Sequence, residues 1–256
     1  MRPESRTQRP AQIGATLSSQ VESVLRTAIV TGQLEAGAKL TMTSLVERYG
    51  VSVTPLREAL QRLSEQGLVV IDARRGTRVT SMSIELARDL YAARLLIEPS
   101  AAGLATQRGD ESWRAAVDSS MRELRAVSLE PRGQSGSNEE ADHDRRWALA
   151  HTAFHSCLVE ACGSMWILRV VQLLHDHCDR YRFVAAHGSL LLPRVTLLDE
   201  HERLCERAVA GDADGVVEAT RTHLELSLEV LETALAPGWQ AADQSRGQRK
   251  GEGELT

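Results

Sequence analysis

The sequence predicts a mainly α protein with two domains: an N-terminal winged helix-turn-helix domain and a C-terminal all-α helical bundle of six or seven helices. Apolar residues recur at helical spacing along most of the chain, and only one pair of short β-prone runs interrupts them. With 256 residues and 42% hydrophobic content, the chain is large enough for two modest cores. We expect a mobile arm at 1–15, a first domain at 16–80, a second at 81–236 and a disordered tail at 237–256.

Charge and cysteine usage narrow the class of protein. Residues 1–80 hold 11 Lys/Arg against seven Asp/Glu, whereas the remainder holds 19 Lys/Arg against 28 Asp/Glu. A basic first domain, called the head below, therefore precedes an acidic second domain. That split favours phosphate binding by the first domain. No apolar run approaches the roughly 20 residues that cross a bilayer, and the N-terminus lacks the apolar core of a secretory signal. We expect a cytoplasmic protein without a membrane partner, its four cysteines reduced.

The first helix of the head is expected at 17–29, where six apolar residues form one stripe. Ser19 and Glu22 have the spacing of a capping box, and Gly32 closes the helix. A second, short helix contains Leu45 and ends at Gly50.

The third helix is short, sharply bounded and polar on its outer face. Its inner stripe consists of Leu56, Ala59, Leu60 and Leu63, and its outer face carries Thr54, Arg57, Glu58 and Gln61. Ser52 or Thr54 suits the cap, and Gly67 supplies a left-handed stop. Two helices joined by a three- or four-residue turn have helix-turn-helix spacing, so this helix is predicted to enter DNA.

A β-hairpin follows directly, with runs at 68–71 and 77–80 separated by DARRG. Arg74, Arg75 and Gly76 lie at its tip. A solvated basic turn is the alternative for such a hairpin in isolation. Behind a recognition helix, a wing that meets the sugar-phosphate backbone or a minor groove is the favoured interpretation.

The stretch GVSVTPLREALQRLSEQGLV resembles the helix-turn-helix signature of GntR-family transcription regulators. Two arginines typical of that family are replaced here by Thr43 and Val53, so the operator is expected to differ from the usual half-site. Val53 offers a contact to a thymine methyl instead. The predicted DNA-binding residues are Thr43, Arg48, Ser52, Val53, Thr54, Arg57, Gln61, Arg74, Arg75 and Gly76.

The second domain reads as six helices at about 83–106, 111–127, 143–162, 164–187, 193–211 and 213–235, with Pro193 and Asp212 as helix starts. A polar, Gly/Ser-rich loop, expected to be mobile, occupies 128–142.

Four histidines on three of these helices point inward by helical periodicity: His151, His155, His201 and His223. A lone inward histidine is usually a core residue bonded to a backbone carbonyl. Four together leave many buried nitrogens to satisfy, and a divalent cation satisfies one on each ring. The i, i+4 spacing of His151 and His155 also suits chelation from one helix.

Residues 83–235 resemble the FCD effector domain of the FadR subfamily of GntR regulators. The resemblance implies metal ligation by the His155, His201 and His223 positions, with His151 replacing the usual aspartate. Such a nitrogen-rich site favours zinc, then nickel, over manganese, and its extra positive charge favours an anionic effector. Arg94 is implied to contact an effector carboxylate; an internal ion pair with Glu98, one turn on, is the equal alternative.

The function that follows is a homodimeric repressor of a palindromic DNA operator, released by a small acidic metabolite bound beside the metal. A metal-sensing regulator is the first alternative. A metalloenzyme is the second, and it is disfavoured because HTAFH lacks the glutamate of HExxH and the Glu140/His143 pair is expected at a loop edge.

Overall fold

The fold was analysed in a computed structural model that describes residues 16–131, 133–134, 137–187 and 194–235. The predicted arm at 1–15 and tail at 237–256 lie outside these residues, as does Pro193. The chain divides into two compact units: residues 38–80 fall in the first together with the helix that ends near Ile29, and residues from 81 onward fall in the second, with Val30–Gly37. Among the described helices, none is long and apolar enough to span a membrane.

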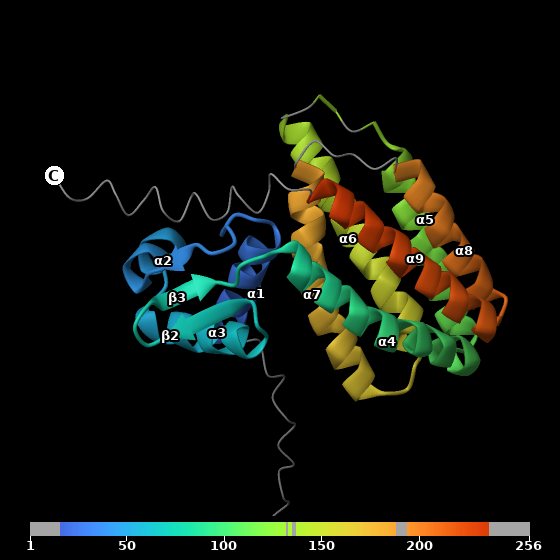
Figure 1. The fold of residues 1–256 in the computed structure, drawn as a ribbon, viewed down its shortest axis with the longest axis horizontal. Helices are drawn as coiled ribbons and strands as arrows, with labels where there is room; N and C mark the ends of the chain where they lie inside the picture. Colours follow the sequence, from blue (N-terminus) through green and yellow to red (C-terminus); the bar gives the residue numbers. More distant parts are fainter. Residues whose placement is uncertain (1–15, 132, 135–136, 188–193, 236–256) are drawn as a thin grey trace, which may run out of the picture. The chain divides into compact units, whose positions relative to one another are not determined.

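The first unit is a winged helix-turn-helix (Figure 1). It contains α1 (Leu17–Val30), β1 (Lys39–Leu40), α2 (Met42–Tyr49), α3 (Val53–Glu65), β2 (Val69–Asp72) and β3 (Gly76–Val79). The antiparallel sheet has the order β1-β3-β2, with Val70 opposite Arg78 and Asp72 opposite Gly76. The predicted hairpin is therefore present. Its core includes Val21, Leu25, Ala28, Ile29, Leu45, Leu56, Ala59, Leu60, Leu63, Leu68 and Val79.

Strand β1 was not predicted from the sequence. It is two residues long and pairs Lys39 with Arg78 and Leu40 with Thr77. Two residues are too few to show an alternating pattern, so only the neighbouring β3 reveals this strand.

The predicted capping box of α1 is wrong. The helix begins three residues earlier than that box requires, and the Oγ1 of Thr16 accepts a hydrogen bond from the Ser19 N–H at 3.2 Å. Glu22 instead accepts from Arg26 at 2.8 Å and from Gln66 at 3.0 Å. Its carboxylate joins α1 to the end of α3 because a nearby cation and amide compete with the backbone N–H.

The turn between α2 and α3 depends on Gly50, whose φ of 66° places it in the left-handed region. Its N–H donates to the Val46 carbonyl at 2.9 Å. Ser52 occupies the N-cap position of α3, but its side chain makes no capping bond, so it remains available to an outside partner. Gly67, with a φ of 72°, terminates the far end as predicted.

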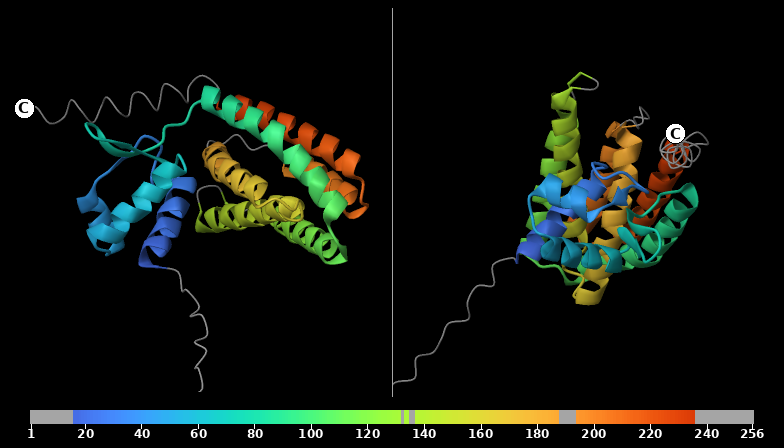
Figure 2. Two further views of the ribbon diagram at one scale, coloured as in Figure 1. Left: turned by 90° about the horizontal axis from the view of Figure 1, so that it is seen from below. Right: turned by 90° about the vertical axis from the view of Figure 1, so that its left-hand side faces the viewer.

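The second unit contains six described helices: α4 (Ile84–Arg108), α5 (Glu111–Leu129), α6 (Asn138–Glu160), α7 (Met165–His187), α8 (Arg194–Val209) and α9 (Ala213–Ala234). Helices α4 and α9 run side by side, and α5 packs against α6 and α8 (Figures 1 and 2). At Gly103 on α4, a Cβ would lie 2.7 Å from Val217 Cγ2, so glycine permits the close approach to α9. Asp212 caps α9 as predicted.

The polar loop is shorter than predicted, because α6 begins at Asn138 rather than at 143. Ser137 caps the helix by accepting from the Glu140 N–H at 3.1 Å. Glu139 and Glu140 then lie in the first turn, where negative charge is favourable to the helix dipole. The hydrophilic composition that suggested a loop is the composition of a helix N-terminus.

Candidate functional site

All ten predicted DNA-binding residues are exposed on the first unit. They lie on three neighbouring parts of the helix-turn-helix and wing: Thr43 and Arg48 on α2, Ser52, Val53, Thr54, Arg57 and Gln61 on or before α3, and Arg74, Arg75 and Gly76 at the hairpin tip.

Helix α3 owes its orientation to a fully apolar inner face. Leu56 and Ala59 are completely buried against the head, which directs Arg57 and Gln61 outward. Val53 remains 40% exposed at the start of the helix. An exposed β-branched side chain at that position suits contact with an apolar group such as a thymine methyl.

The wing tip is preorganised by Asp72. Its Oδ1 accepts from the backbone N–H groups of Arg74 and Arg75, each at 2.7 Å. These bonds lower the pKa of Asp72 and hold the turn. Gly76 follows with a φ of 77°, and the two arginine side chains point into solvent.

In the second unit, the four predicted histidines converge from α6, α8 and α9. His155 Nε2 lies 3.2 Å from His151 Nε2 and 3.0 Å from His201 Nε2. The ring centroid of His223 is 5.0 Å from that of His155 and 4.6 Å from that of His201. One ligating atom from each ring lies within 4.8 Å of the others, and all four side chains are buried.

Three histidines of the cluster, His151, His155 and His223, have pKa values well below the usual range. Burial, followed by the positive charge of Arg182, lowers the pKa of His151 well below its usual range. Burial and the neighbouring imidazoles act in the same direction on the pKa values of His155 and His223. Neutral imidazole is the form that donates a lone pair to a metal ion.

The donor set fits a divalent cation better than a hydrogen-bonded cluster. A neutral imidazole has one N–H, and His155 Nε2 faces two other nitrogens with at most one proton to share. The Nδ1 atoms of His151 and His223 have no hydrogen-bond partner in the described part of the chain. Ligands held ~2.0–2.1 Å from one ion in tetrahedral geometry lie roughly 3.3–3.4 Å apart, and the two Nε2 separations of 3.2 and 3.0 Å are slightly shorter than this spacing.

The metal-free protein is expected to lose stability as the pH falls below 6.5. Below pH 6.5 these histidines are protonated in the unfolded state but stay unprotonated in the folded state, because their folded pKa values lie below the ordinary 6.5. This stability is fully present above pH 6.5. As the pH falls from 6.5 toward the folded pKa values, the free energy of unfolding decreases by up to about 1.4 kcal/mol per pH unit for each histidine. Urea unfolding with EDTA at pH 7.5 and 5.5 measures the loss; an equal midpoint at both pH values would contradict it.

Arg94 forms the internal ion pair that was the alternative to effector binding. It is 1% exposed, and its Nε and Nη2 donate to the two Glu98 oxygens at 2.7 and 3.0 Å. Nη1 donates to Cys178 Sγ at 3.0 Å, and Tyr91 OH lies 3.2 Å from the same sulfur. Burial alone would raise the pKa of Glu98, but the Arg94 charge, assisted by His175, keeps that pKa well below its usual range.

His175 also belongs to this interior, although helical periodicity predicted no role for it. Its Nε2 is 3.4 Å from Glu98 Oε2, and the alignment of this contact falls short of a hydrogen bond. The ring centroid lies 6.0 Å from that of His155. The signal in the sequence was the i, i+3 spacing of His175 and Cys178, which places both on the α7 face that meets α4.

The Glu140/His143 pair is not at a loop edge, because both residues lie within α6. His143 is buried, and its Nε2 lies 3.0 Å from the Val127 carbonyl. This histidine bonds to the end of α5 and is separate from the four-histidine cluster.

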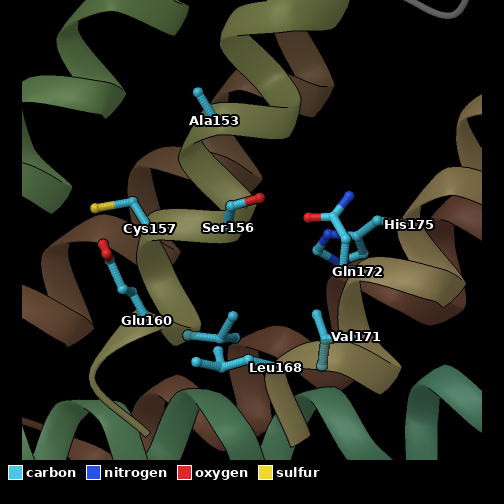
Figure 3. A pocket seen from close by; sticks show the side chains of 9 residues that line it. Ala153, Ser156, Cys157, Glu160, Leu168, Val171, Gln172 and His175 are labelled. Atoms are coloured by element: carbon cyan, nitrogen blue, oxygen red, sulfur yellow. The ribbon is translucent and has the colours of Figure 1, made fainter. Parts of the chain in front are cut away.

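A cleft of about 320 Å³ opens between α6 and α7 (Figure 3). Ser156 on α6 points across it toward Gln172 and His175 on α7. Leu168 and Val171 supply an apolar part of the lining. His175 therefore lies between this cleft and the buried Arg94–Glu98 pair.

Comparison with known proteins identifies both units. Residues 17–79 match the model of the bacterial regulatory proteins of the gntR family, and residues 89–226 match the FCD domain. The chain is 34% identical to the uncharacterized HTH-type transcriptional regulator BphR of Paraburkholderia xenovorans (strain LB400), over 85% of this chain and 87% of that protein. It is 33% identical to the HTH-type transcriptional repressor GlaR of Escherichia coli (strain K12), over 83% and 94%.

The fold also matches a solved structure, E. coli McbR/YncC. The TM-score is 0.69 at 17% identity, and the match covers 86% of this chain and 99% of that one. Members of the matched family are DNA-binding transcriptional regulators and not enzymes, which removes the metalloenzyme alternative. The chain belongs to the GntR family of bacterial transcriptional regulators and carries an FCD domain behind its winged helix-turn-helix domain.

Proposed function

We propose that the protein is a homodimeric repressor that leaves a two-fold symmetric operator when a small carboxylate-bearing effector binds beside a divalent metal ion. The observation that carries the effector part is the convergence of four buried imidazoles in the same domain as the buried Arg94. The name of the relative GlaR, a transcriptional repressor, supports repression as the mode of action.

On the DNA side, α3 would enter the major groove through its exposed N-terminal face. Arg57 and Gln61 offer side chains long enough for base edges, and Val53 offers an apolar contact. The exposed arginines of the wing would neutralise phosphates. A dimer places two such heads on successive half-sites, which gives the operator its symmetry.

On the effector side, His151, His155, His201 and His223 would hold the cation, with zinc as the first candidate and nickel as the second. A bound divalent cation supplies a positive charge that attracts a carboxylate. Arg94 would hold the effector carboxylate from the α4 side. Repression would end because the effector has different affinities for the DNA-binding and released arrangements of the dimer.

Direct sensing of the metal is a second candidate, favoured by the state of Arg94. Its guanidinium is engaged by Glu98 and Cys178, so in this arrangement the bundle offers ligands for a cation while Arg94 is not free to hold an anion. Equilibrium dialysis separates the two: a sensed metal exchanges reversibly and shifts operator affinity by itself, whereas a structural metal resists mild chelation.

The function is tested by binding of the purified protein to DNA from upstream of its own gene, with a random duplex alongside. We expect selective binding whose log affinity falls steeply with log salt, and release when a carboxylate joins the zinc-loaded protein. Equal, weak binding to both duplexes would refute the DNA part. Carboxylates that bind the protein yet leave operator affinity unchanged would refute the effector part.

A further inference from the structure

Arg94 is already occupied by a carboxylate of its own chain. Glu98 receives two hydrogen bonds from the guanidinium in the fork arrangement that a bound carboxylate ligand would adopt. The third guanidinium nitrogen, Nη1, donates to Cys178 Sγ, and the guanidinium carbon lies 4.8 Å from the centre of the Tyr91 ring. An external carboxylate therefore gains the same two-point contact only after Glu98 has moved away.

The structure provides a place for the displaced Glu98 side chain. His175 Nε2 is buried, lacks a hydrogen-bond partner within the described residues, and lies 3.4 Å from Glu98 Oε2. A small rotation of the glutamate would convert this poorly aligned contact into a hydrogen bond from the Nε2–H tautomer. The exchange needs no change of protonation and keeps the carboxylate bonded throughout.

The same exchange connects two helices. Arg94 and Glu98 belong to α4, whereas His175 and Cys178 belong to α7. Moving Glu98 from Arg94 to His175 replaces a bond within α4 by one between α4 and α7. His175 also lines the cleft between α6 and α7 (Figure 3). A ligand that enters through this cleft would therefore contact His175 before it reaches Arg94.

We propose that Glu98 is the specificity-determining residue of the effector site, acting as an internal competitor for Arg94 that yields to His175. A ligand with a two-oxygen carboxylate replaces what Glu98 gives to Arg94, whereas neutral alcohols and amides do not. This inference rests on the proposed function, because it defines how the effector of that site is selected.

The test is calorimetric titration of the full chain, with added zinc, using succinate as the probe and neutral succinamide as the matched ligand control. E98Q removes the competing charge and raises the fraction of protein whose Arg94 is available, so succinate should bind about tenfold tighter than to the wild type. H175L keeps the Arg94–Glu98 pair but removes the receiving group, so succinate should bind about tenfold weaker. Succinamide should not bind to the wild type or to either variant.

The control variant is E225Q, which removes the same charge from an exposed position of α9 and should bind succinate as the wild type does. Circular dichroism checks the fold of each variant. If E98Q does not fold, E98D takes its place, because a carboxylate one methylene shorter loosens the two-point contact and should also tighten succinate binding.

Wild-type or weaker succinate affinity in the folded Glu98 variant would overturn the inference while leaving the carboxylate effector intact. Absence of succinate binding in every variant would overturn both the inference and the effector class of the proposed function. Retained repression with no carboxylate response would then point to direct sensing of the metal.

Discussion

Replacing His155 with alanine is expected to lower zinc affinity by on the order of 100-fold, the largest effect of any single substitution in the bundle. His155 Nε2 is the nitrogen nearest to two others, 3.2 Å from His151 and 3.0 Å from His201, so its loss removes the centre of the donor set. At a zinc concentration 1,000 times the wild-type Kd, the ligand contributes about 4 kcal/mol of stability; a 100-fold weaker site retains about 1.4 kcal/mol.

Thermal unfolding with zinc and with EDTA measures this difference. The wild type should show a large shift in Tm on zinc addition, and His155→Ala should show a small one. His177→Ala is the matched control, because His177 lies on α7 outside the cluster and is half-buried. A zinc-induced shift in His155→Ala equal to that of the wild type would show that the cluster holds no metal.

Replacing Arg57 with alanine is expected to weaken operator binding by about 10- to 100-fold, equivalent to ~1–3 kcal/mol. Arg57 is exposed on α3, between the exposed Thr54 and Gln61, and its neighbours Leu56 and Ala59 carry the packing of the helix. Truncating the side chain therefore removes a DNA contact at little cost to the fold. With Thr43 and Val53 in place of arginines, Arg57 is expected to carry a larger share of recognition.

Fluorescence anisotropy with operator and random duplexes distinguishes the two kinds of contact. A base contact makes Arg57→Ala lose affinity for the operator alone, whereas a phosphate contact weakens both duplexes and reduces the salt slope by about one. Arg122→Ala, 71% exposed on α5 in the other unit, serves as the charge-matched control. Wild-type operator affinity in Arg57→Ala would exclude α3 as the recognition helix.

Most elements of both domains followed from periodicity. The stripe of Leu56, Ala59, Leu60 and Leu63 fixed which face of α3 is buried, because a helix in water must cover its apolar side. The same rule predicted that His151, His155, His201 and His223 point inward, and the structure places their rings together. Helix ends were predicted at Gly50 and Gly67, and both glycines adopt the left-handed conformation, which no other residue adopts as readily.

Three features were settled only by the tertiary structure. Strand β1 exists because β3 lies beside it. His175 joins the interior because the packing of α7 against α4 brings it to Glu98, 77 positions earlier in the chain. Arg94 pairs with Glu98 because both are sealed from water, where an unpaired charge is costly. Periodicity determines which face of each helix turns inward, but the side chains that meet there are determined by how the helices pack.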